Sequence, residues 1–225
     1  MLKGQNISAD ILIGLSGQTI DQVKKSIDLA LAGGVNHLSV YALTPEVGTP
    51  IYTDYLNGEL LSDDEVADIY DEIVVYLKEK GFSRYEVSNF AKDGYYSRHN
   101  LNYWKRGEYI GVGVSASSFM ENRRFTNTFK IDEYLNAIIY NKNPEISSDL
   151  IEGEDAKFEF IMLGLRTANG ISIDEFNKTF SADFLTEYKG VLSNKAKFLS
   201  LDGDNLKIKD EYLYVQNDII LSFMK

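Results

Sequence analysis

The stretch ISADILIGLSGQTIDQVKKSIDLALAGGVNHLSVY, residues 7–41, decides the fold class of this chain. Its opening apolar run over 7–13 predicts a buried strand, and a glycine-rich loop follows over 14–17. Thr19 and Gln22 form a capping box that starts a helix, which ends before a second apolar run over 37–41. A strand, a helix and a strand in this order make a βαβ unit, which implies neighbouring parallel strands.

The same pattern continues further along the chain. Ser62 and Glu65 form a second capping box, and the apolar spacing from Val66 to Leu77 predicts a helix that ends at Gly81. A third strand is expected over 84–87. Three parallel strands and two helices cannot close a barrel. The α/β part is therefore expected to be the second half of something larger.

An aromatic and basic window follows over residues 92–130. It carries seven basic side chains against three acidic ones, together with eight aromatic rings and four glycines. Inside it lies RHNLNYW, residues 98–104, with one of the two histidines and the single tryptophan. Positive charge mixed with flat rings suits a ligand that is itself flat and anionic.

The C-terminal part is predicted to be mainly helical. Helical patterns are expected at 132–140, 154–166, 172–180, 182–193 and 217–224, with a hairpin over 198–208 and a linker over 143–153. Helices followed by a small hairpin resemble a winged-helix domain. The expected domains are 1–142 and 150–225. From residue 150 onward, thirteen acidic residues outnumber nine basic ones, which argues against binding DNA.

Composition excludes several classes of function. A net charge of −11 and a pI near 4.7 argue against general binding of nucleic acid or of anionic membranes. No apolar run approaches the roughly 20 residues that span a bilayer, so stable membrane insertion is not expected and a cytoplasmic location is. Because the chain has no cysteine, it cannot supply thiolate ligands to zinc or to an iron–sulfur cluster.

Four segments in order resemble the oxygen-independent coproporphyrinogen III oxidase family of radical S-adenosylmethionine (SAM) proteins. Residues 8–19 resemble its DLIxGLPGQT segment, residues 43–50 its LTPExGTP segment, and residues 85–91 its YEISNFA segment. Residues 98–104 match RHNxxYW, which marks the HemW branch of heme chaperones. The resemblance covers about residues 6–135, and the rest is similar to the helical C-terminal domain of the family.

The resemblance implies an α/β fold, namely the second part of a partial (β/α)6 radical-SAM-type barrel followed by a mainly helical, winged-helix-like C-terminal domain. The family binds SAM and a [4Fe–4S] cluster held by a CxxxCxxC motif, which is absent from this chain. Without the cluster, SAM cannot be cleaved reductively. The chain is therefore expected not to do radical chemistry alone, and no residue is assigned as catalytic.

The HemW branch also implies a heme site at RHNLNYW. In this interpretation His99 is the axial ligand of the heme iron, Asn100 orients or lines the site, and Tyr103 and Trp104 lie along the macrocycle. Three cations would neutralise the propionates: Arg98, Lys105 and Arg106. The alternative is that His99 caps a turn while Tyr103 and Trp104 simply pack.

Asp10 and Thr44 match family positions that approach SAM in an intact homologue. The alternative for Asp10 is an acid bonded to backbone or to a neighbouring base. His37 opens an apolar strand and is expected to be structural. Ser117 stands where the family pattern GLGxGAHSY has histidine, which weakens the heme interpretation.

Three functions compete at this point. The leading one is HemW-like binding and transfer of heme or porphyrin by a chain that lacks the iron–sulfur half. The second is the C-terminal portion of a coproporphyrinogen III oxidase, an enzyme of porphyrin biosynthesis. The third is a structural fragment that binds a partner, either a second copy of itself or a missing N-terminal half.

Overall fold

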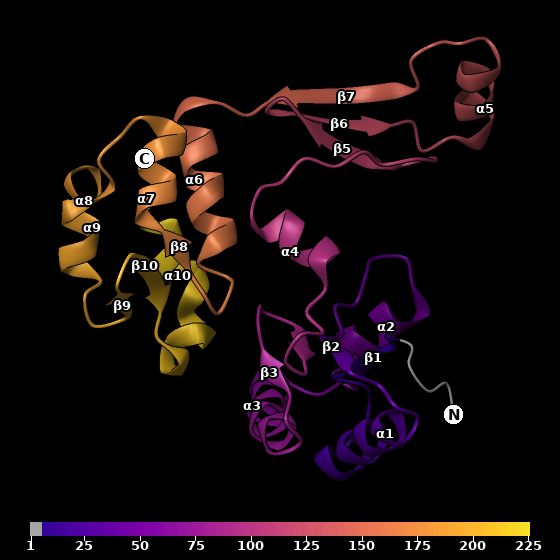
Figure 1. The fold of residues 1–225 in the computed structure, drawn as a ribbon. Helices are drawn as coiled ribbons and strands as arrows, with labels where there is room; N and C mark the ends of the chain where they lie inside the picture. Colours follow the sequence, from indigo (N-terminus) through magenta and orange to yellow (C-terminus); the bar gives the residue numbers. More distant parts are fainter. Residues whose placement is uncertain (1–5) are drawn as a thin grey trace. The chain divides into compact units, whose positions relative to one another are not determined.

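The computed structural model describes residues 6–225 and divides them into two compact units, the first ending at Ser97 and the second running from Arg98 to Lys225 (Figure 1). The expected division into 1–142 and 150–225 stays a prediction. The segment expected to link those two domains is not a linker but a strand.

The first unit is built on a four-stranded sheet and three helices. Strands β1 and β2 pair in parallel, with Ser8 opposite His37 and Ile13 opposite Ala42, so the expected βαβ unit is present. The elements are β1 (Ser8–Ile13), α1 (Ile20–Ala32), β2 (His37–Ala42), α2 (Pro50–Leu56), α3 (Asp63–Glu79), β3 (Ser83–Arg84) and β4 (Asn89–Ala91).

The expected third strand over 84–87 is present only as the two-residue β3, which runs in the direction of β2 but does not pair with β1 or β2. The chain reverses after β3, and β4 enters the sheet antiparallel to both β2 and β3, giving the order β1-β2-β4-β3. The amide of Tyr85 donates to the carbonyl of Asn89 (3.1 Å) and closes this reversal. Strand β3 contains only Ser83 and Arg84, whereas β4 places the large apolar side chain of Phe90 in the core, where it is 1% exposed.

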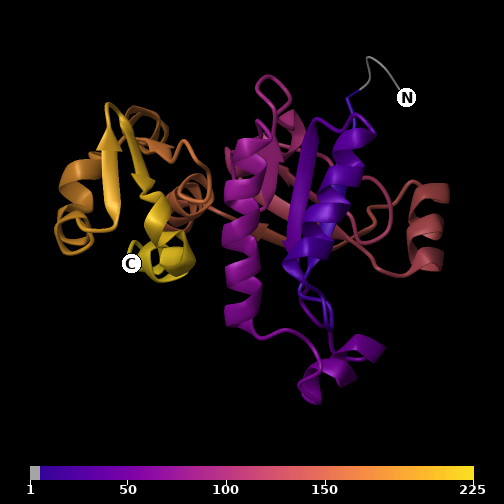
Figure 2. The same ribbon diagram turned by 90° about the horizontal axis from the view of Figure 1, so that it is seen from below.

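Helices α1 and α3 cover the same face of this sheet (Figures 1 and 2). Both predicted capping boxes are present, because the hydroxyls of Thr19 and Ser62 accept the amides of Gln22 and Glu65 and the reciprocal bonds also form. The core between helices and sheet is apolar and includes Val23, Ile27, Ile73, Leu77, Leu38, Val40 and Phe90.

The second unit begins with α4 (Arg98–Trp104) and an antiparallel sheet of β5 (Ser117–Met120), β6 (Arg123–Asn127) and β7 (Glu145–Leu150), in that order. Helix α5 (Ile131–Ile139) lies between β6 and β7 along the chain. Strand β7 corrects the expected linker over 143–153. Four of its six residues are polar and most are exposed, so its hydrophobic signal is weak, and its place is set by backbone pairing with β6.

The C-terminal part of the second unit packs helices around a small sheet of order β8-β10-β9. The predicted hairpin is present as β9 and β10. The helix expected over 182–193 is instead two short helices that meet at Tyr188. The elements are α6 (Gly153–Gly164), β8 (Ile171–Ser172), α7 (Ile173–Phe180), α8 (Phe184–Glu187), α9 (Lys189–Asn194), β9 (Leu199–Asp202), β10 (Asn205–Ile208), a 3-10 helix η1 (Asp210–Val215) and α10 (Gln216–Leu221).

Aromatic rings fill the core of this C-terminal part. Phe176 and Phe184 are completely buried, and their ring centroids lie 5.0 Å apart in an edge-to-face contact. Gly170 allows β8 to approach β10, since a Cβ there would lie 2.1 Å from the carbonyl oxygen of Leu206. No helix among residues 6–225 is long and apolar enough to cross a membrane.

Candidate functional site

The predicted heme motif forms helix α4, and its regular spacing brings His99 and Tyr103 together one turn apart. The Tyr103 hydroxyl lies 2.8 Å from Nε2 of His99, and the two rings meet edge to face with centroids 4.7 Å apart. Both side chains are exposed. The helix thus presents a histidine at the surface with its position fixed by a neighbouring phenol.

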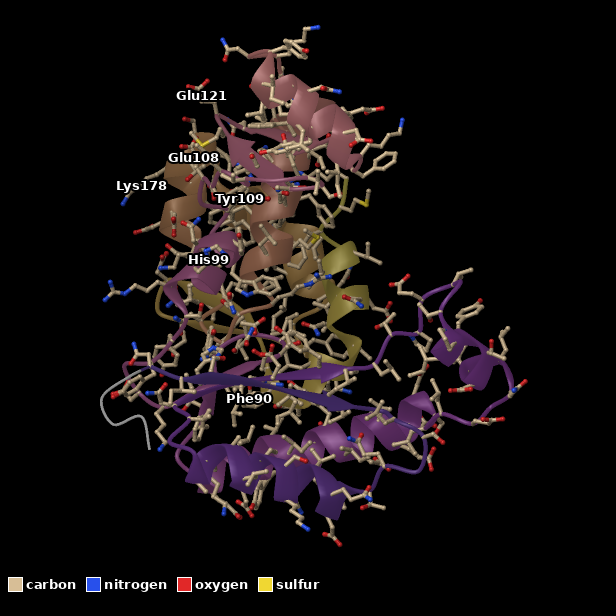
Figure 3. The ribbon with its side chains drawn as sticks, turned by 90° about the vertical axis from the view of Figure 1, so that its right-hand side faces the viewer. Phe90, His99, Glu108, Tyr109, Glu121 and Lys178 are labelled. Atoms are coloured by element: carbon tan, nitrogen blue, oxygen red, sulfur yellow. The ribbon has the colours of Figure 1, made fainter. Side chains whose placement is uncertain are left out.

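The Tyr103 ring continues into a row of aromatic rings. Its edge meets Tyr109 at a centroid distance of 4.7 Å, and Tyr109 lies 6.4 Å from Phe119. The backbones of Tyr109 and Phe119 exchange two hydrogen bonds of 2.9 Å, which ties this row to β5. Figure 3 labels His99 on α4 and Tyr109 on the segment that follows.

A glycine closes the turn that follows α4. The side-chain amide of Asn102 donates to the carbonyl of Glu108 (3.0 Å), and the Gly107 amide donates to the carbonyl of Asn102 (2.8 Å). A Cβ at position 107 would lie 2.1 Å from Oδ1 of Asn102. Glycine therefore lets Asn102 hold the turn that carries the chain from the histidine toward Tyr109.

A buried ion network lies beside this turn, and it was not foreseen from the sequence. Glu159 of α6 accepts from Nε of Arg106 (2.8 Å) and pairs with Nη2 of Arg124 on β6 (2.8 Å). The guanidinium of Arg106 also donates to Oδ1 of Asn122 and to the carbonyl of Ile151. The network ties the turn after α4 to β6 and α6.

This network corrects the expected role of Arg106. Its side chain is 10% exposed, and Nε, Nη1 and Nη2 each have a protein acceptor, so it is committed to holding the fold rather than to a propionate. Arg98 and Lys105 are exposed on the same segment, while Asn100 and Trp104 are half-buried. Two of the three cations expected at the propionates, Arg98 and Lys105, therefore stay open to solvent.

The predicted SAM residues lie in the first unit. Asp10 is exposed on β1, where Ser8, Asp10 and Leu12 alternate with the more buried side chains of the same strand. Thr44 is exposed in the loop after β2. Their roles toward SAM stay predictions.

Ser117 lies on β5, where its hydroxyl is 2.9 Å from the hydroxyl of Thr126 across the sheet. It takes part in strand pairing rather than in the row of rings beside His99. The change from the family histidine to Ser117 therefore leaves the His99–Tyr103 pair intact.

His37 is held between two hydroxyl groups in the first unit. Its Nδ1 lies 2.8 Å from the Ser8 hydroxyl and its Nε2 lies 2.8 Å from the Tyr85 hydroxyl. Burial lowers the pKa of His37 from its ordinary value of 6.5, and the charge of Asp10 opposes this in part. The geometry agrees with the expected structural role.

The lowered pKa of His37 predicts that acid destabilises the first unit. As the pH falls below 6.5, the unfolded chain binds a proton on this histidine before the folded chain does, so stability present above that pH is lost. We expect the protection of the β2 amides against hydrogen exchange, relative to the intrinsic rate at each pH, to fall as the pH is lowered from about 7.5 to about 5.5.

A glutamine at position 37 keeps groups that can bond Ser8 and Tyr85 but does not titrate. In His37→Gln the same exchange should lose most of this extra pH dependence. An identical acid response in the variant and the wild type would rule out His37 as its source.

The donor set of the described residues does not fit an iron–sulfur cluster or a similar metal centre. Among residues 6–225 no group of three His, Cys, Asp or Glu side chains is arranged to hold a metal ion. The whole sequence has no cysteine to ligate iron through sulfur. The residues of this chain therefore cannot by themselves hold the cluster that radical SAM chemistry needs.

Comparison with known proteins shows that this chain is similar to proteins named HemN and to proteins named HemW. The family model of the HemN C-terminal domain matches residues 151–213. The heme chaperone HemW of Lactococcus lactis is 30% identical over 224 residues, which cover 98% of this chain and 59% of the relative. HemW of Bacillus subtilis is 31% identical over 195 residues, covering 86% of this chain and 52% of the relative.

A solved structure has a similar fold. The coproporphyrinogen III oxidase HemN from Escherichia coli, described as a radical SAM enzyme, matches with a TM-score of 0.75 at 15% identity, over 97% of this chain and 54% of that chain. At such low sequence identity, the structural match is evidence for the mixed α/β fold alone. The chain spans somewhat more than half the length of these relatives and corresponds to their C-terminal part, so the resemblance inferred from the four sequence segments is confirmed.

Proposed function

We propose, from the similarity of this chain to the C-terminal part of HemW heme chaperones, that it binds heme at α4 and passes it on. The observation that carries the proposal is His99, exposed on α4 inside the motif that marks the HemW branch. An exposed imidazole can reach the iron of a flat cofactor without prior opening of the core.

The surroundings of His99 suit the rest of a heme molecule. Tyr103 and Trp104 offer aromatic surface to the macrocycle, and Asn100 lies on the same helix. Arg98 and Lys105 are exposed and can pair with propionates, since carboxylates form strong charge-assisted hydrogen bonds with such groups. Heme is the cargo of this protein in the proposal, with His99 as the ligand of its iron.

The proposal includes no radical chemistry by this chain. In an intact homologue Asp10 and Thr44 would contact SAM, with Asp10 accepting from ribose hydroxyls. We also propose the finer architecture, in which the first unit is the second part of a partial (β/α)6 barrel. The helices and β8-β10-β9 sheet of the C-terminal part would then form the winged-helix-like domain. The expected cytoplasmic location stays a prediction.

The proposal is tested by titrating the chain with hemin and following the Soret band. We expect a saturable shift at one hemin per chain, because one histidine ligand is proposed. Metal-free protoporphyrin is the matched probe, since it has the same ring and propionates but no iron. It should bind more weakly. A linear, unsaturable response to hemin would contradict the proposal.

A second candidate is a partner-binding fragment, and helix α5 favours it. This helix directs apolar side chains to solvent, since Ile131, Leu135, Ile138 and Ile139 are each at least half exposed. A stable dimer in light scattering together with no hemin binding would support this candidate. The coproporphyrinogen III oxidase alternative rests on the likeness to HemN in fold and in the C-terminal domain, and assaying a full-length homologue for coproporphyrinogen decarboxylation would decide it.

A further inference from the structure

One ring nitrogen of His99, Nε2, already has a partner in the heme-free chain. The Tyr103 hydroxyl lies 2.8 Å from Nε2 of His99. If Tyr103 donates, its hydrogen occupies the Nε2 lone pair. If Nε2 carries the hydrogen and donates, the free lone pair of the neutral ring is on Nδ1. In either tautomer Nε2 has no free lone pair for iron.

The Tyr103 ring is held where its hydroxyl can return to this position. It contacts His99 at an interplanar angle of 77° and Tyr109 at 89°, both with centroids 4.7 Å apart. Edge-to-face contacts of this kind are favourable. Tyr109 is itself fixed by the two backbone bonds to Phe119. The phenol is therefore supported on one side by the ring of Tyr109, which is itself anchored to β5 through Phe119.

We propose that Tyr103 is an internal competitor with heme iron for Nε2 of His99, an inference that rests on the proposed function. Heme binding exchanges the Tyr103–His99 hydrogen bond for a nitrogen–iron bond, and heme release restores it. Tyr103 keeps its proton throughout and no electron is transferred. In the tautomer with hydrogen on Nε2, that proton moves to Nδ1 through solvent before iron binds.

The competition weakens heme binding by a modest factor. Tyr103 is 38% exposed, so its hydrogen bond to His99 is partly balanced by bonds to water. A single bond of this kind changes an equilibrium constant by about 2- to 10-fold. A carrier that must give up its cargo benefits from a hydroxyl that takes the histidine back as the iron leaves.

The test compares Tyr103→Phe with Tyr109→Phe and the wild type in hemin titrations. Each variant keeps an aromatic ring and removes one hydroxyl, but only the first hydroxyl touches His99. We expect Tyr103→Phe to bind hemin about 2- to 10-fold more tightly and to deliver it more slowly to apomyoglobin. The Soret position should stay that of the wild type, because His99 is still the ligand. Tyr109→Phe should bind as the wild type does.

A second readout needs no heme. The ring nitrogen shifts of His99 in the heme-free protein should move in Tyr103→Phe and not in Tyr109→Phe, while those of His37 stay in place. Unchanged or weaker hemin binding by Tyr103→Phe, or equal tightening by Tyr109→Phe, would overturn the inference while leaving the proposed function standing. Absence of saturable hemin binding by the wild type would instead refute the proposed function and this inference with it.

Discussion

Glu159→Ala is expected to lower the free energy of unfolding of the second unit by about 3–5 kcal/mol. Glu159 pairs with Arg106 and Arg124, and its own side chain is 10% exposed. Removing the carboxylate leaves the guanidinium of Arg106, whose side chain is also only 10% exposed, without its charged partner. The loss is larger than for an exposed ion pair because the buried Arg106 cannot simply return to solvent.

The surroundings of the two arginines explain why they cannot rearrange cheaply. Both guanidinium groups lie over the ring of Phe119, at 4.8 Å for Arg106 and 5.2 Å for Arg124. Phe119 is 2% exposed, so moving either cation away uncovers a buried ring. Alanine is a better helix former than glutamate in α6, but that gain is only a few tenths of a kcal/mol.

Urea unfolding followed by fluorescence measures this loss. Trp104 is the single tryptophan, and it lies on α4 two residues before Arg106, so its signal reports on the second unit. The control is Glu154→Ala on the same helix, whose side chain is 50% exposed beside Lys157 and which should cost less than about 1 kcal/mol. Equal effects of the two substitutions would contradict a stabilising network.

Much of the first unit could be predicted because its signals are local. The capping residues Thr19 and Ser62 start helices whose apolar stripes face one sheet, and each signal lies within the element that it specifies. Strand β4 was missed because three residues carry little pattern. Strand β7 was missed because its side chains are mostly polar and largely exposed, and its place is set by its pairing with β6.

The candidate site likewise contains one contact that the local sequence predicts and one that it does not. The pairing of His99 with Tyr103 follows from their four-residue spacing once the segment is a helix. The commitment of Arg106 does not follow, since Glu159 is 53 residues away in the chain and nothing in the local sequence indicates the contact. Of the three cations expected at the propionates, Arg106 instead pairs with the buried Glu159.

His99→Ala is expected to weaken hemin binding by at least about 100-fold and to abolish the Soret shift. Loss of an outer-shell partner of a metal ligand typically costs about 10- to 100-fold in affinity, and loss of the ligand itself should cost more. The fold should survive, since His99 is exposed and its hydrogen bond to Tyr103 is at the surface. His37→Gln is the matched control, because His37 and His99 are the two histidines of the chain.

The iron ligand can be observed directly by electron–nuclear double resonance on hemin-loaded protein grown with nitrogen-15 histidine. The proposed site predicts a coupling from one histidine nitrogen in the wild type and in His37→Gln, and its loss in His99→Ala. A coupling that persists in His99→Ala, or none at all in hemin-loaded wild type, would contradict ligation of heme iron by His99.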